Sequence, residues 1–431
     1  MKVLVIGKGG REHVLCWSFA KSPYVKEVIA LPGSDGISSV ARCVDIAEDA
    51  HEEIVSLVKK ELVDLVVIGP EAPLVAGLGD RLTEEGIRVF GPSQQAARVE
   101  GSKEFAKEMM RKYDIPTGEY DVFDSLTDAK AYVEKKGTPI VIKADGLAAG
   151  KGVVVAMNEE QAMEALEQML DEKHFGEAGS RVVIEEYLEG EECSLMAFVN
   201  GETVIPMVPA QDHKRAYDGD LGPNTGGMGA YSPVPHISNQ VIREAETQIV
   251  RKMAYALKQE NSLFTGVLYA GLMITKDGPK VIEFNARFGD PEAQVVLPRL
   301  LTPLDEVIFS VLKNQEMEVE WSEEAVMGVV LASEGYPGPY ENGVPVNEHL
   351  LSEAAGPFFH AGTKKTADGW ITAGGRVGIV TSMNTSLLKA QQAIYSVLEQ
   401  DPSEGLFYRS DIGSRAISAS YAGASSPDKK Q

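Results

Sequence analysis

The sequence is poor in cysteine and has no long apolar run. Its 431 residues include three cysteines, Cys16, Cys43 and Cys193, which are far apart and form no CxxC pair. This spacing excludes a disulfide framework and a zinc ribbon, and it is typical of buried small side chains. No stretch reaches the ~18 apolar residues of a membrane span. The chain opens on a strand-like MKVLVIG instead of a signal peptide, so we expect a cytoplasmic protein without membrane partners.

Positive charge is also scarce. The chain has 41 Lys and Arg residues against 64 Asp and Glu residues, which gives a formal net charge of −23. Such a surface repels phosphate backbones, and this excludes general binding of nucleic acid. An anionic substrate would need local basic side chains or backbone amides that act against the overall field.

The composition is otherwise that of a globular protein, with 44% hydrophobic residues, and the length predicts about three domains. In the first hundred residues, short apolar runs alternate with helical stretches. Strands are predicted at 3–6, 28–31, 65–68 and 87–90, with helices near 14–19 and 50–61. This alternation predicts a doubly wound parallel sheet.

The pattern changes after the first hundred residues. A helix over 102–113 leads to a break at 115–117, and strands with short connections follow. Further on, the sequence predicts a long helix near 239–259, a hairpin turn at Asp277-Gly278, strands at 326–333 and 374–380, a helix near 385–399 and a frayed tail from Ser414. We therefore expect an α/β multidomain protein.

The first glycine-rich loop, Gly7-Lys8-Gly9-Gly10-Arg11-Glu12, lies between a predicted strand and a predicted helix. Its glycines and helix N-terminal amides suit a phosphate group. A dinucleotide fingerprint would need glycine where Glu12 stands and an acid after the second strand, which ends in Leu31-Pro32-Gly33. Nicotinamide or flavin binding is therefore disfavoured, and a phosphate-bearing substrate and a simple tight turn remain as alternatives.

A second glycine-rich loop runs from Lys143 to Gly152 between two predicted strands. It has one residue too few between its glycines for a Walker A loop, and it lacks the Ser or Thr that holds magnesium. A flap between two strands that carries Lys143 and Lys151 suits a lid closing over a triphosphate.

Two strand ends carry polar side chains. The strand over 182–186 runs into acids before Gly190, and these could bind adenine and ribose or be solvated. In the strand that leads into the RFGDPE turn, Glu283, Asn285 and Arg287 share one face because alternate residues of a strand point the same way. A carboxylate, an amide oxygen and a guanidinium together predict a Mg²⁺ site beside a phosphate.

Residues 211–231 show little apolar periodicity, which predicts a functional loop. Gly226, Gly227 and Gly229 would let backbone amides surround a small anion. His213 stands alone, so it forms no ligand cluster, and no zinc motif or Ser/His/Asp arrangement is present.

Eight motifs occur in order along the chain: GKGGREH, GPEAPL, EGSKEF, IKADGLAAGKGV, VIEEYLEGEECS, QDHKR, GPNTGGMGAYSP and VIEFNARFGDPE. Together they closely resemble the glycinamide ribonucleotide synthetase family of the ATP-grasp superfamily, from Met1 to about Ile417. The resemblance implies that ATP, glycine and 5-phosphoribosylamine react to ADP, phosphate and glycinamide ribonucleotide in purine biosynthesis. The glycine carboxylate would first become an acyl phosphate, which the amine then attacks.

The resemblance also implies a domain organisation. Residues 1–101 would form the N-terminal doubly wound domain and 102–318 the ATP-grasp domain, with a lid subdomain at about 118–190. Residues 319–417 would form a C-terminal α/β domain, and 418–431 a frayed tail. Small-molecule substrates would be the partners of a monomer.

Site residues follow from the same motifs. ATP phosphates would meet Lys103, Lys143 and the flap residues Gly150, Lys151 and Gly152, with Glu185 and the Leu188 backbone at adenine and Glu191 or Glu192 at the ribose. Glu283 and Asn285 would hold Mg²⁺ or Mn²⁺, and Arg287 and Lys143 would be catalytic. Phosphoribosylamine would contact Gly9, Gly10, Arg11, Glu12 and Glu71, whereas Asp212, Lys214, Thr225, Gly226, Gly227 and Asp290 would lie near the glycine and the transferred phosphate.

A two-residue turn at Asp277-Gly278 would place Leu272 opposite Glu283, where many relatives in the superfamily carry a second acid. With one carboxylate and one amide, we expect weak metal affinity in the absence of nucleotide. Two rival functions stay open: another ATP-grasp ligase of purine metabolism, such as a formate-using one, and a non-catalytic nucleotide-binding regulator.

Overall fold

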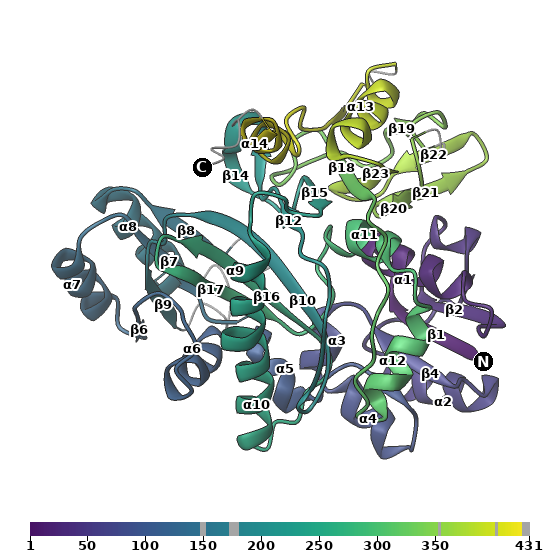
Figure 1. Cartoon of the computed structure of the whole chain (residues 1–431), viewed down its shortest axis with the longest axis horizontal. Coiled ribbons are helices and arrows are strands. Elements are labelled where there is room, and N and C mark those ends of the chain that lie inside the picture. Colours follow the sequence, from purple (N-terminus) through teal and green to yellow (C-terminus); the bar gives the residue numbers. More distant parts are fainter. Residues whose placement is uncertain (147–151, 172–180, 352–354, 401–403, 425–431) are drawn as a thin grey trace, which may run out of the picture.

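The computed structural model describes residues 1–146, 152–171, 181–351, 355–400 and 404–424. Figure 1 shows a purple N-terminal sheet on one side, a blue lobe with β6 to β9 on the opposite side, and a yellow-green C-terminal region above them. The expected α/β multidomain class is therefore confirmed.

The N-terminal unit is a five-stranded parallel sheet in the order β3-β2-β1-β4-β5. Its strands are β1 (Lys2–Gly7), β2 (Glu27–Pro32), β3 (Arg42–Cys43), β4 (Leu65–Ile68) and β5 (Val89–Phe90). Its helices are α1 (Gly10–Ala20), η1 (Ile37–Ser39), α2 (His51–Glu61), α3 (Glu71–Val75) and α4 (Leu78–Glu84). The predicted doubly wound sheet is present, although its last strand is shorter than 87–90.

Both faces of β1 are buried, which explains its unbroken apolar run. Val3 and Val5 pack in one hydrophobic cluster with residues of α1. Leu4 and Ile6 pack on the other face, with residues of α2. Layers of helices on both faces hold the start of α1, and with it the first glycine loop, at the carboxyl end of β1.

Helices α5 (Gln94–Gly101) and α6 (Lys103–Lys112) connect this unit to a small antiparallel sheet. The sheet has the order β6-β9-β7-β8 and its own apolar core. Its elements are β6 (Tyr120–Phe123), α7 (Leu126–Lys136), β7 (Ile140–Ala144), β8 (Val153–Ala156), α8 (Glu159–Leu166), η2 (Glu167–Asp171) and β9 (Val182–Glu186). The two strands predicted on either side of the flap pair as the antiparallel hairpin β7–β8, and flap residues 147–151 lie outside the described residues.

A second antiparallel sheet has the order β11-β10-β16-β17. It consists of β10 (Glu191–Asn200), β11 (Thr203–Pro206), β16 (Thr265–Thr275) and β17 (Gly278–Asn285). The predicted helix over 239–259 is continuous in space, as α9 (Asn239–Ala245), a π-helical turn η5 (Glu246–Val250) and α10 (Arg251–Gln259).

The predicted register of the β16–β17 hairpin is wrong. Thr275 pairs with Gly278, and an irregularity between Gly271 and Leu272 places Gly271 opposite Glu283. Leu272 pairs with Val281 and is fully buried. The extra residue of this bulge shifts every pair beyond it. The position opposite Glu283 still offers no second carboxylate, because glycine has no side chain.

The C-terminal sheet has six strands, in the order β12-β15-β18-β23-β20, with β24 paired to β18. Its strands are β12 (Gln211–Asp212), β15 (Gly229–Ser232), β18 (Ala325–Ser333), β20 (Phe358–His360), β23 (Arg376–Asn384) and β24 (Leu406–Phe407). Two of them come from the segment predicted as a loop, which also forms the ribbon β13 (Arg215–Tyr217) and β14 (Leu221–Asn224) around η4 (Asp218–Asp220). The sheet therefore crosses the expected boundary at residue 319.

The remaining elements complete the chain. They are α11 (Ala293–Val296), η6 (Leu297–Arg299), α12 (Leu304–Leu312), β19 (Pro345–Val346), β21 (Thr363–Thr366), β22 (Gly369–Thr372), α13 (Leu387–Leu398) and α14 (Ser414–Ala424). Among them, α12 packs against β10, β11 and α1. Helix α14 differs from the frayed tail expected from Ser414 and, over 418–424, from the tail expected at 418–431. It forms because Ala416 is fully buried in the hydrophobic cluster and Ile417 packs against that cluster.

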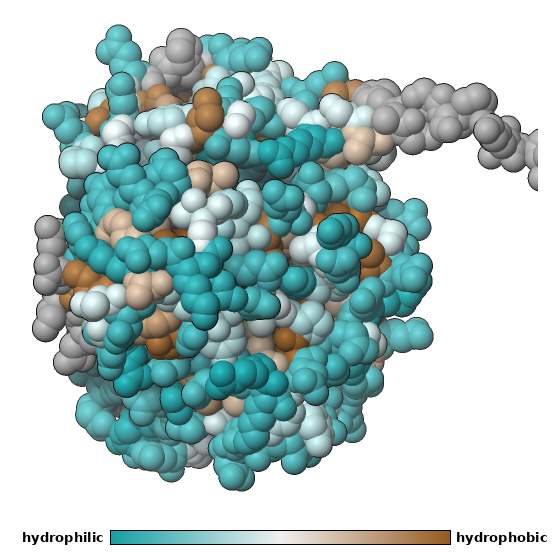
Figure 2. Space-filling model, turned by 90° about the vertical axis from the view of Figure 1, so that its left-hand side faces the viewer, coloured by the Kyte–Doolittle hydropathy of each residue, from teal (hydrophilic) through white to brown (hydrophobic). Residues whose placement is uncertain are grey.

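Hydrophilic side chains cover most of the face drawn in Figure 2, and apolar residues appear there only in small separate groups. No helix within the described ranges is long and apolar enough to cross a membrane.

Candidate active site

A cavity of about 870 Å³ lies where the N-terminal unit, the two antiparallel sheets and the C-terminal sheet meet. Sixteen predicted site residues line it: Arg11, Glu71, Lys103, Lys143, Gly152, Glu185, Leu188, Glu192, Asp212, Lys214, Thr225, Gly226, Glu283, Asn285, Arg287 and Asp290. Gly9, Gly10, Glu12, Glu191 and Gly227 are described residues that do not line it. Gly150 and Lys151 lie outside the described residues.

Two lysines and one carboxylate form a buried cluster at the β7–β9 end of the cavity, here called the nucleotide end. Lys143 Nζ lies 2.9 Å from Glu185 Oε1, and Lys107 Nζ lies 2.8 Å from Glu185 Oε2. Lys143 also donates to the carbonyl of Ile282 at 2.8 Å. Burial alone would raise the pKa of Glu185, but the two ammonium groups lower it.

The sequence does not mark Lys107 as a site residue, because a lysine of a helix such as α6 normally faces water. Its side chain is 2% exposed because Thr117 and Glu185 accept hydrogen bonds from it inside the fold. Lys103 begins the same helix, and its Nζ donates to the Gly146 carbonyl at 2.8 Å. Burial lowers the pKa of Lys103, so the cavity wall holds a desolvated cation close to the start of the flap.

The two acids that follow Gly190 lie on opposite sides of strand β10. Glu192 lines the cavity, with its Oε2 3.4 Å from Lys214 Nζ. Glu191 lies outside the lining, and its Oε2 is 3.8 Å from Arg415 of helix α14. Alternation along the strand accounts for this difference.

Glu283 and Asn285 both line the cavity at the end of β17. Glu283 Oε1 lies 3.7 Å from Lys214 Nζ, and Asn285 Oδ1 accepts from Arg287 Nη2 at 3.4 Å. Burial alone would raise the pKa of Glu283, but Lys214 and Lys143 lower it, so the carboxylate is charged. Oxygen donors of this kind fit a hard divalent cation. The described residues contain no cluster of three His, Cys, Asp or Glu side chains suited to a metal.

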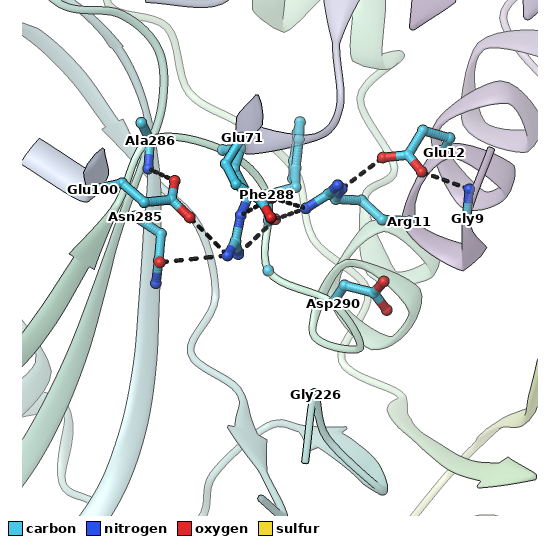
Figure 3. Close-up of polar contacts among 12 residues, drawn as sticks. Gly9, Arg11, Glu12, Glu71, Glu100, Gly226, Asn285, Ala286, Phe288 and Asp290 are labelled. Carbon is cyan, nitrogen blue, oxygen red and sulfur yellow. Dashed lines mark hydrogen bonds and ion pairs between the residues drawn. The ribbon is translucent and has the colours of Figure 1, made fainter. Parts of the chain in front are cut away.

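A chain of alternating charges forms the opposite end of the cavity, here called the acceptor end, and Figure 3 shows its members. Arg287 Nη2 lies 2.8 Å from Glu100 Oε1, and its Nε lies 3.4 Å from Glu71 Oε2. Glu71 Oε2 is also 3.9 Å from Arg11 Nη1, and Arg11 Nε is 2.6 Å from Glu12 Oε1. This chain connects the β17 end with the first glycine loop.

Two of these carboxylates hold backbone groups as well. Glu100 Oε2 accepts from the Ala286 amide at 2.7 Å, and Glu12 Oε2 accepts from the Gly9 amide at 2.7 Å. Burial alone would lower the pKa of Arg287, but the carboxylates of Glu100 and Glu71 raise it, so it stays a cation. Glu100 stands in the EGSKEF motif, but its place beside Arg287 was not predicted, because the two residues are far apart along the chain.

Glu12 turns inward at the position where a dinucleotide fingerprint has its third glycine. A Cβ atom on Gly7 would lie 2.4 Å from Glu12 Cγ, and one on Gly69 would lie 2.2 Å from Glu12 Oε1. Two glycines therefore make room for the Glu12 side chain. In this way Gly7 and Gly69 allow the close packing that the third glycine of a fingerprint would otherwise allow. Glu12, held in this space, accepts a hydrogen bond from Arg11 Nε and fixes the position of that side chain.

The Thr225–Gly227 segment and the RFGDPE turn lie against each other. Gly226 donates through its amide to Tyr336 Oη at 2.9 Å, and Arg376 Nη1 donates to the Gly226 carbonyl at 2.8 Å. Arg376 Nη2 also lies 3.0 Å from Asp290 Oδ2. Tyr336 and Arg376 were not predicted, because they belong to the C-terminal region, where no motif had suggested a site.

The two sheets close on a cavity lined by lysines and carboxylates, with an acid–amide pair at one strand end, and this arrangement defines an ATP-grasp enzyme. Residues 101–293 match the phosphoribosylglycinamide synthetase ATP-grasp (A) domain. Residues 1–100 match the N domain of the same synthetase, and 326–415 match its C domain. The chain belongs to the phosphoribosylglycinamide synthetase family.

Alignments with similar proteins cover nearly the whole chain. The phosphoribosylamine–glycine ligase of Halalkalibacterium halodurans is 60% identical over 97% of this chain and 97% of its own length. That of Listeria innocua is 49% identical over 96% of this chain and 100% of its own. The crystal structure of phosphoribosylamine–glycine ligase from Thermotoga maritima superposes with a TM-score of 0.81 at 33% identity, covering 95% of this chain and 100% of that one.

Proposed function

We propose that the protein joins glycine to 5-phosphoribosylamine at the expense of ATP, giving glycinamide ribonucleotide, ADP and phosphate in purine biosynthesis. Its relatives from Halalkalibacterium and Listeria are phosphoribosylamine–glycine ligases. The observation that carries the proposal is the single cavity that joins the nucleotide end, the Glu283–Asn285 pair and the acceptor end.

The reaction needs positioning and neutralised charge more than a covalent nucleophile. An oxygen of the glycine carboxylate would attack the terminal phosphorus of ATP, and ADP would leave with the electrons of the broken P–O bond. The amine nitrogen of phosphoribosylamine would then attack the carbonyl carbon of glycyl phosphate. Phosphate leaves with the C–O bond electrons, and the nitrogen releases a proton as the amide forms.

At the nucleotide end, we assign Lys103 and Lys143 to the ATP phosphates and the 145–152 flap to their cover. A cover over the cavity would protect the acyl phosphate from water. Glu185 and the Leu188 backbone would meet adenine. For the ribose we favour Glu192 over Glu191, since Glu192 lines the cavity.

Glu283 and Asn285 would hold the divalent cation, which would neutralise phosphate charge when bound. We expect weak binding without nucleotide, because Gly271 opposite Glu283 supplies no further ligand. Calorimetric titration of the nucleotide-free protein with Mg²⁺ and with Mn²⁺ tests this; tight stoichiometric uptake would contradict it. The same titration in the presence of ADP compares the two metals.

At the acceptor end, the first glycine loop and Glu71 would hold phosphoribosylamine, with Arg11 directed into the cavity by Glu12. Arg287 would stabilise charge on the transferred phosphoryl group. Asp212, Lys214, Asp290 and the Thr225–Gly227 segment would surround glycine and the phosphate that is released.

The first experiment is ADP release with ATP, Mg²⁺, glycine and freshly generated phosphoribosylamine, leaving out each component in turn. ADP that appears only with the complete mixture, together with equal glycinamide ribonucleotide, is the expected result. Release with formate in place of glycine would move the function to the rival ligase.

A non-catalytic regulator is the second alternative, and Glu283→Ala distinguishes it. A ligase should lose turnover when a metal ligand is removed, whereas a pure sensor could keep its nucleotide affinity. The cytoplasmic location and the monomeric state remain predictions, which cell fractionation and analytical ultracentrifugation test.

A further inference from the structure

Most carboxylates in the cavity wall already face a cation of the protein. Glu185 lies between Lys143 and Lys107, and Asp290 pairs with Arg376. Glu71 and Glu100 pair with Arg287. Glu192 and Glu283 both face Lys214, at 3.4 and 3.7 Å. Each of these carboxylates has a charge partner before any substrate enters.

Glu292 differs from them. It lines the cavity, is 3% exposed and belongs to the RFGDPE turn. Its Oε1 accepts hydrogen bonds from Tyr269 Oη at 2.8 Å and from Ser194 Oγ at 2.9 Å, and these two hydroxyls are 3.0 Å apart. Among the described residues, no Lys, Arg or His side chain forms an ion pair with it. Neutral donors fix the carboxylate in place without neutralising its charge.

The second oxygen, Oε2, lies against Gly289. A Cβ atom on Gly289 would lie 2.5 Å from this oxygen, so the glycine makes the room that Oε2 occupies and a side chain there would displace it. Two hydroxyls hold one oxygen, and the other is left for a further donor. Arg287 interacts with this carboxylate electrostatically, from beyond ion-pair distance. A carboxylate that the fold buries and orients, and that no cation of the described residues contacts directly, suits a cationic ligand.

Glycine brings such a cation. It is a zwitterion at neutral pH, and only its carboxylate has a role in accepting the phosphoryl group. Its ammonium group must leave water to enter the cavity, and this costs free energy unless an anion receives it.

Asp212 is the other acid in this part of the wall without a cation within ion-pair distance among the described residues. Burial raises the pKa of Asp212 to about 8; Lys214 opposes this shift, and the carboxylate of Glu292 adds to it. Near neutral pH this carboxyl therefore holds a proton for much of the time, and it offers a cation less charge.

We propose that Glu292 is the anionic partner of the glycine ammonium group and that it selects an amino acid over other small carboxylic acids. This inference rests on the function proposed above, since it names the residue that recognises one of the substrates. The Tyr269 and Ser194 hydroxyls are positioning groups that hold Glu292 Oε1.

The test is Glu292→Gln, which preserves size and the acceptor for Tyr269 and Ser194 but removes the charge. Initial rates of ADP release are measured with varied glycine and, separately, with varied glycolate, which has a hydroxyl in place of the ammonium. KM for glycine should rise by roughly 10- to 100-fold, the range of a charged hydrogen bond. The ratio of kcat/KM for glycine over glycolate should fall by a similar factor, and KM for ATP should stay within about twofold.

Glu323→Gln is the matched control, because the same chemical change is made at an exposed site. Asp212→Asn is the rival variant. If Asp212→Asn lowers the glycine-over-glycolate ratio and Glu292→Gln leaves it unchanged, Asp212 holds the ammonium and the proposal is wrong. It is also wrong if Glu292→Gln raises KM for glycine, glycolate and ATP alike, since that pattern indicates a structural role.

Glu292→Asp supplies a second test, which also serves if the Gln variant does not fold. It retains the charge but withdraws it by one methylene, so KM for glycine should rise while the preference over glycolate persists. Loss of that preference in the Asp variant would overturn the proposal. Absence of glycine-dependent ADP release in the unmodified protein would instead overturn the proposed function, so the two failures are distinguishable.

Discussion

The two ends of the cavity hold their charges in different ways. At the nucleotide end, Lys107 and Lys143 contact one carboxylate at 2.8 and 2.9 Å, and all three side chains are at least nine-tenths buried. At the acceptor end, Glu71 is shared between Arg287 and Arg11 at 3.4 and 3.9 Å, and its side chain is 32% exposed. The first cluster is rigid and closed, whereas the second has looser contacts that an incoming anion can replace. The difference suggests that one end is built for stability and the other for exchange of partners.

The largest expected effect is on stability at the nucleotide end. Glu185→Gln would leave two buried ammonium groups without their carboxylate, and we expect the free energy of unfolding to fall by about 3–5 kcal/mol. Urea denaturation followed by circular dichroism measures it. The neighbouring Glu186→Gln, at an exposed position, is the control and should change little; equal losses in both variants would remove the contrast between a closed cluster and its surroundings.

Gly69→Ala should have the next largest effect, at the acceptor end. The added Cβ would lie 2.2 Å from Glu12 Oε1 and push that side chain off Arg11 and the Gly9 amide. Overpacking of this kind costs about 1–3 kcal/mol. We expect a lower thermal midpoint together with a raised KM for phosphoribosylamine. Gly86→Ala, where no atom lies within 4 Å but φ is +72°, adds backbone strain away from Glu12, so it should lower the thermal midpoint and leave this KM unchanged. A normal KM in Gly69→Ala would show that Glu12 does not position the loop.

Glu100→Gln should affect turnover by about tenfold, the lower range for a charged hydrogen bond. The amide can still accept from the Ala286 backbone, but Arg287 loses its 2.8 Å partner and is free to turn toward Glu71. The expected pattern is a fall in kcat with KM for ATP little changed. A pure stability loss with normal kcat would mean that Glu100 does not orient Arg287.

A separate effect concerns pH. Asp212 has its pKa raised to about 8 from an ordinary 3.8, chiefly by burial. The folded state therefore binds a proton that the unfolded state has released, so stability declines as pH rises from about 4 to about 8. Asp212→Asn should flatten the dependence of unfolding free energy on pH over this window. Glu185, whose pKa is lowered, has the opposite sign: it stabilises above its ordinary pKa and the contribution is lost in acid.

Denaturant unfolding at several pH values from 5 to 8 checks the sign for Asp212. Curves that run parallel in the Asn variant and the unmodified protein would show that Asp212 keeps its ordinary pKa in the fold.

Features that depend on local pattern were predictable from the sequence. The unbroken run Val3 to Ile6 indicated a strand buried on both faces, and the structure packs alternate residues into two different clusters. Strand alternation also brought Glu283, Asn285 and Arg287 to the cavity wall. Features that depend on contacts between distant segments were not predictable. The turn at Lys276-Asp277 and the extra residue Ile282, opposite Gly271 and Leu272, set the hairpin register without any mark in the apolar pattern. Helix α14 is stabilised by packing that its Ser- and Ala-rich composition does not reveal.

The same limit applies to the charged residues. Lys107 reads as a solvent-facing lysine of α6, and Glu100 as the acidic end of a short helix. Lys107 gains its partner Glu185 only because β9 packs near α6. Glu100 gains its partner Arg287 only because the end of β17 packs near α5. The motifs selected segments that line the cavity, but the pairing of charges within it depends on tertiary packing.

The sheet shared between the central and C-terminal regions also determines whether the chain can be divided between them. Strand β15 pairs with β18 from Gly229↔Val329 to Ser232↔Val326, so a central segment is a structural member of the last unit. A chain shortened at residue 318 would lose the neighbour that holds β15, and with it the support beneath Asp212 on β12. Two fragments divided near residue 318 should therefore regain activity only when β15 of one pairs with β18 of the other. Proteolytic cleavage near residue 320 should leave the two parts associated through the same strand pair.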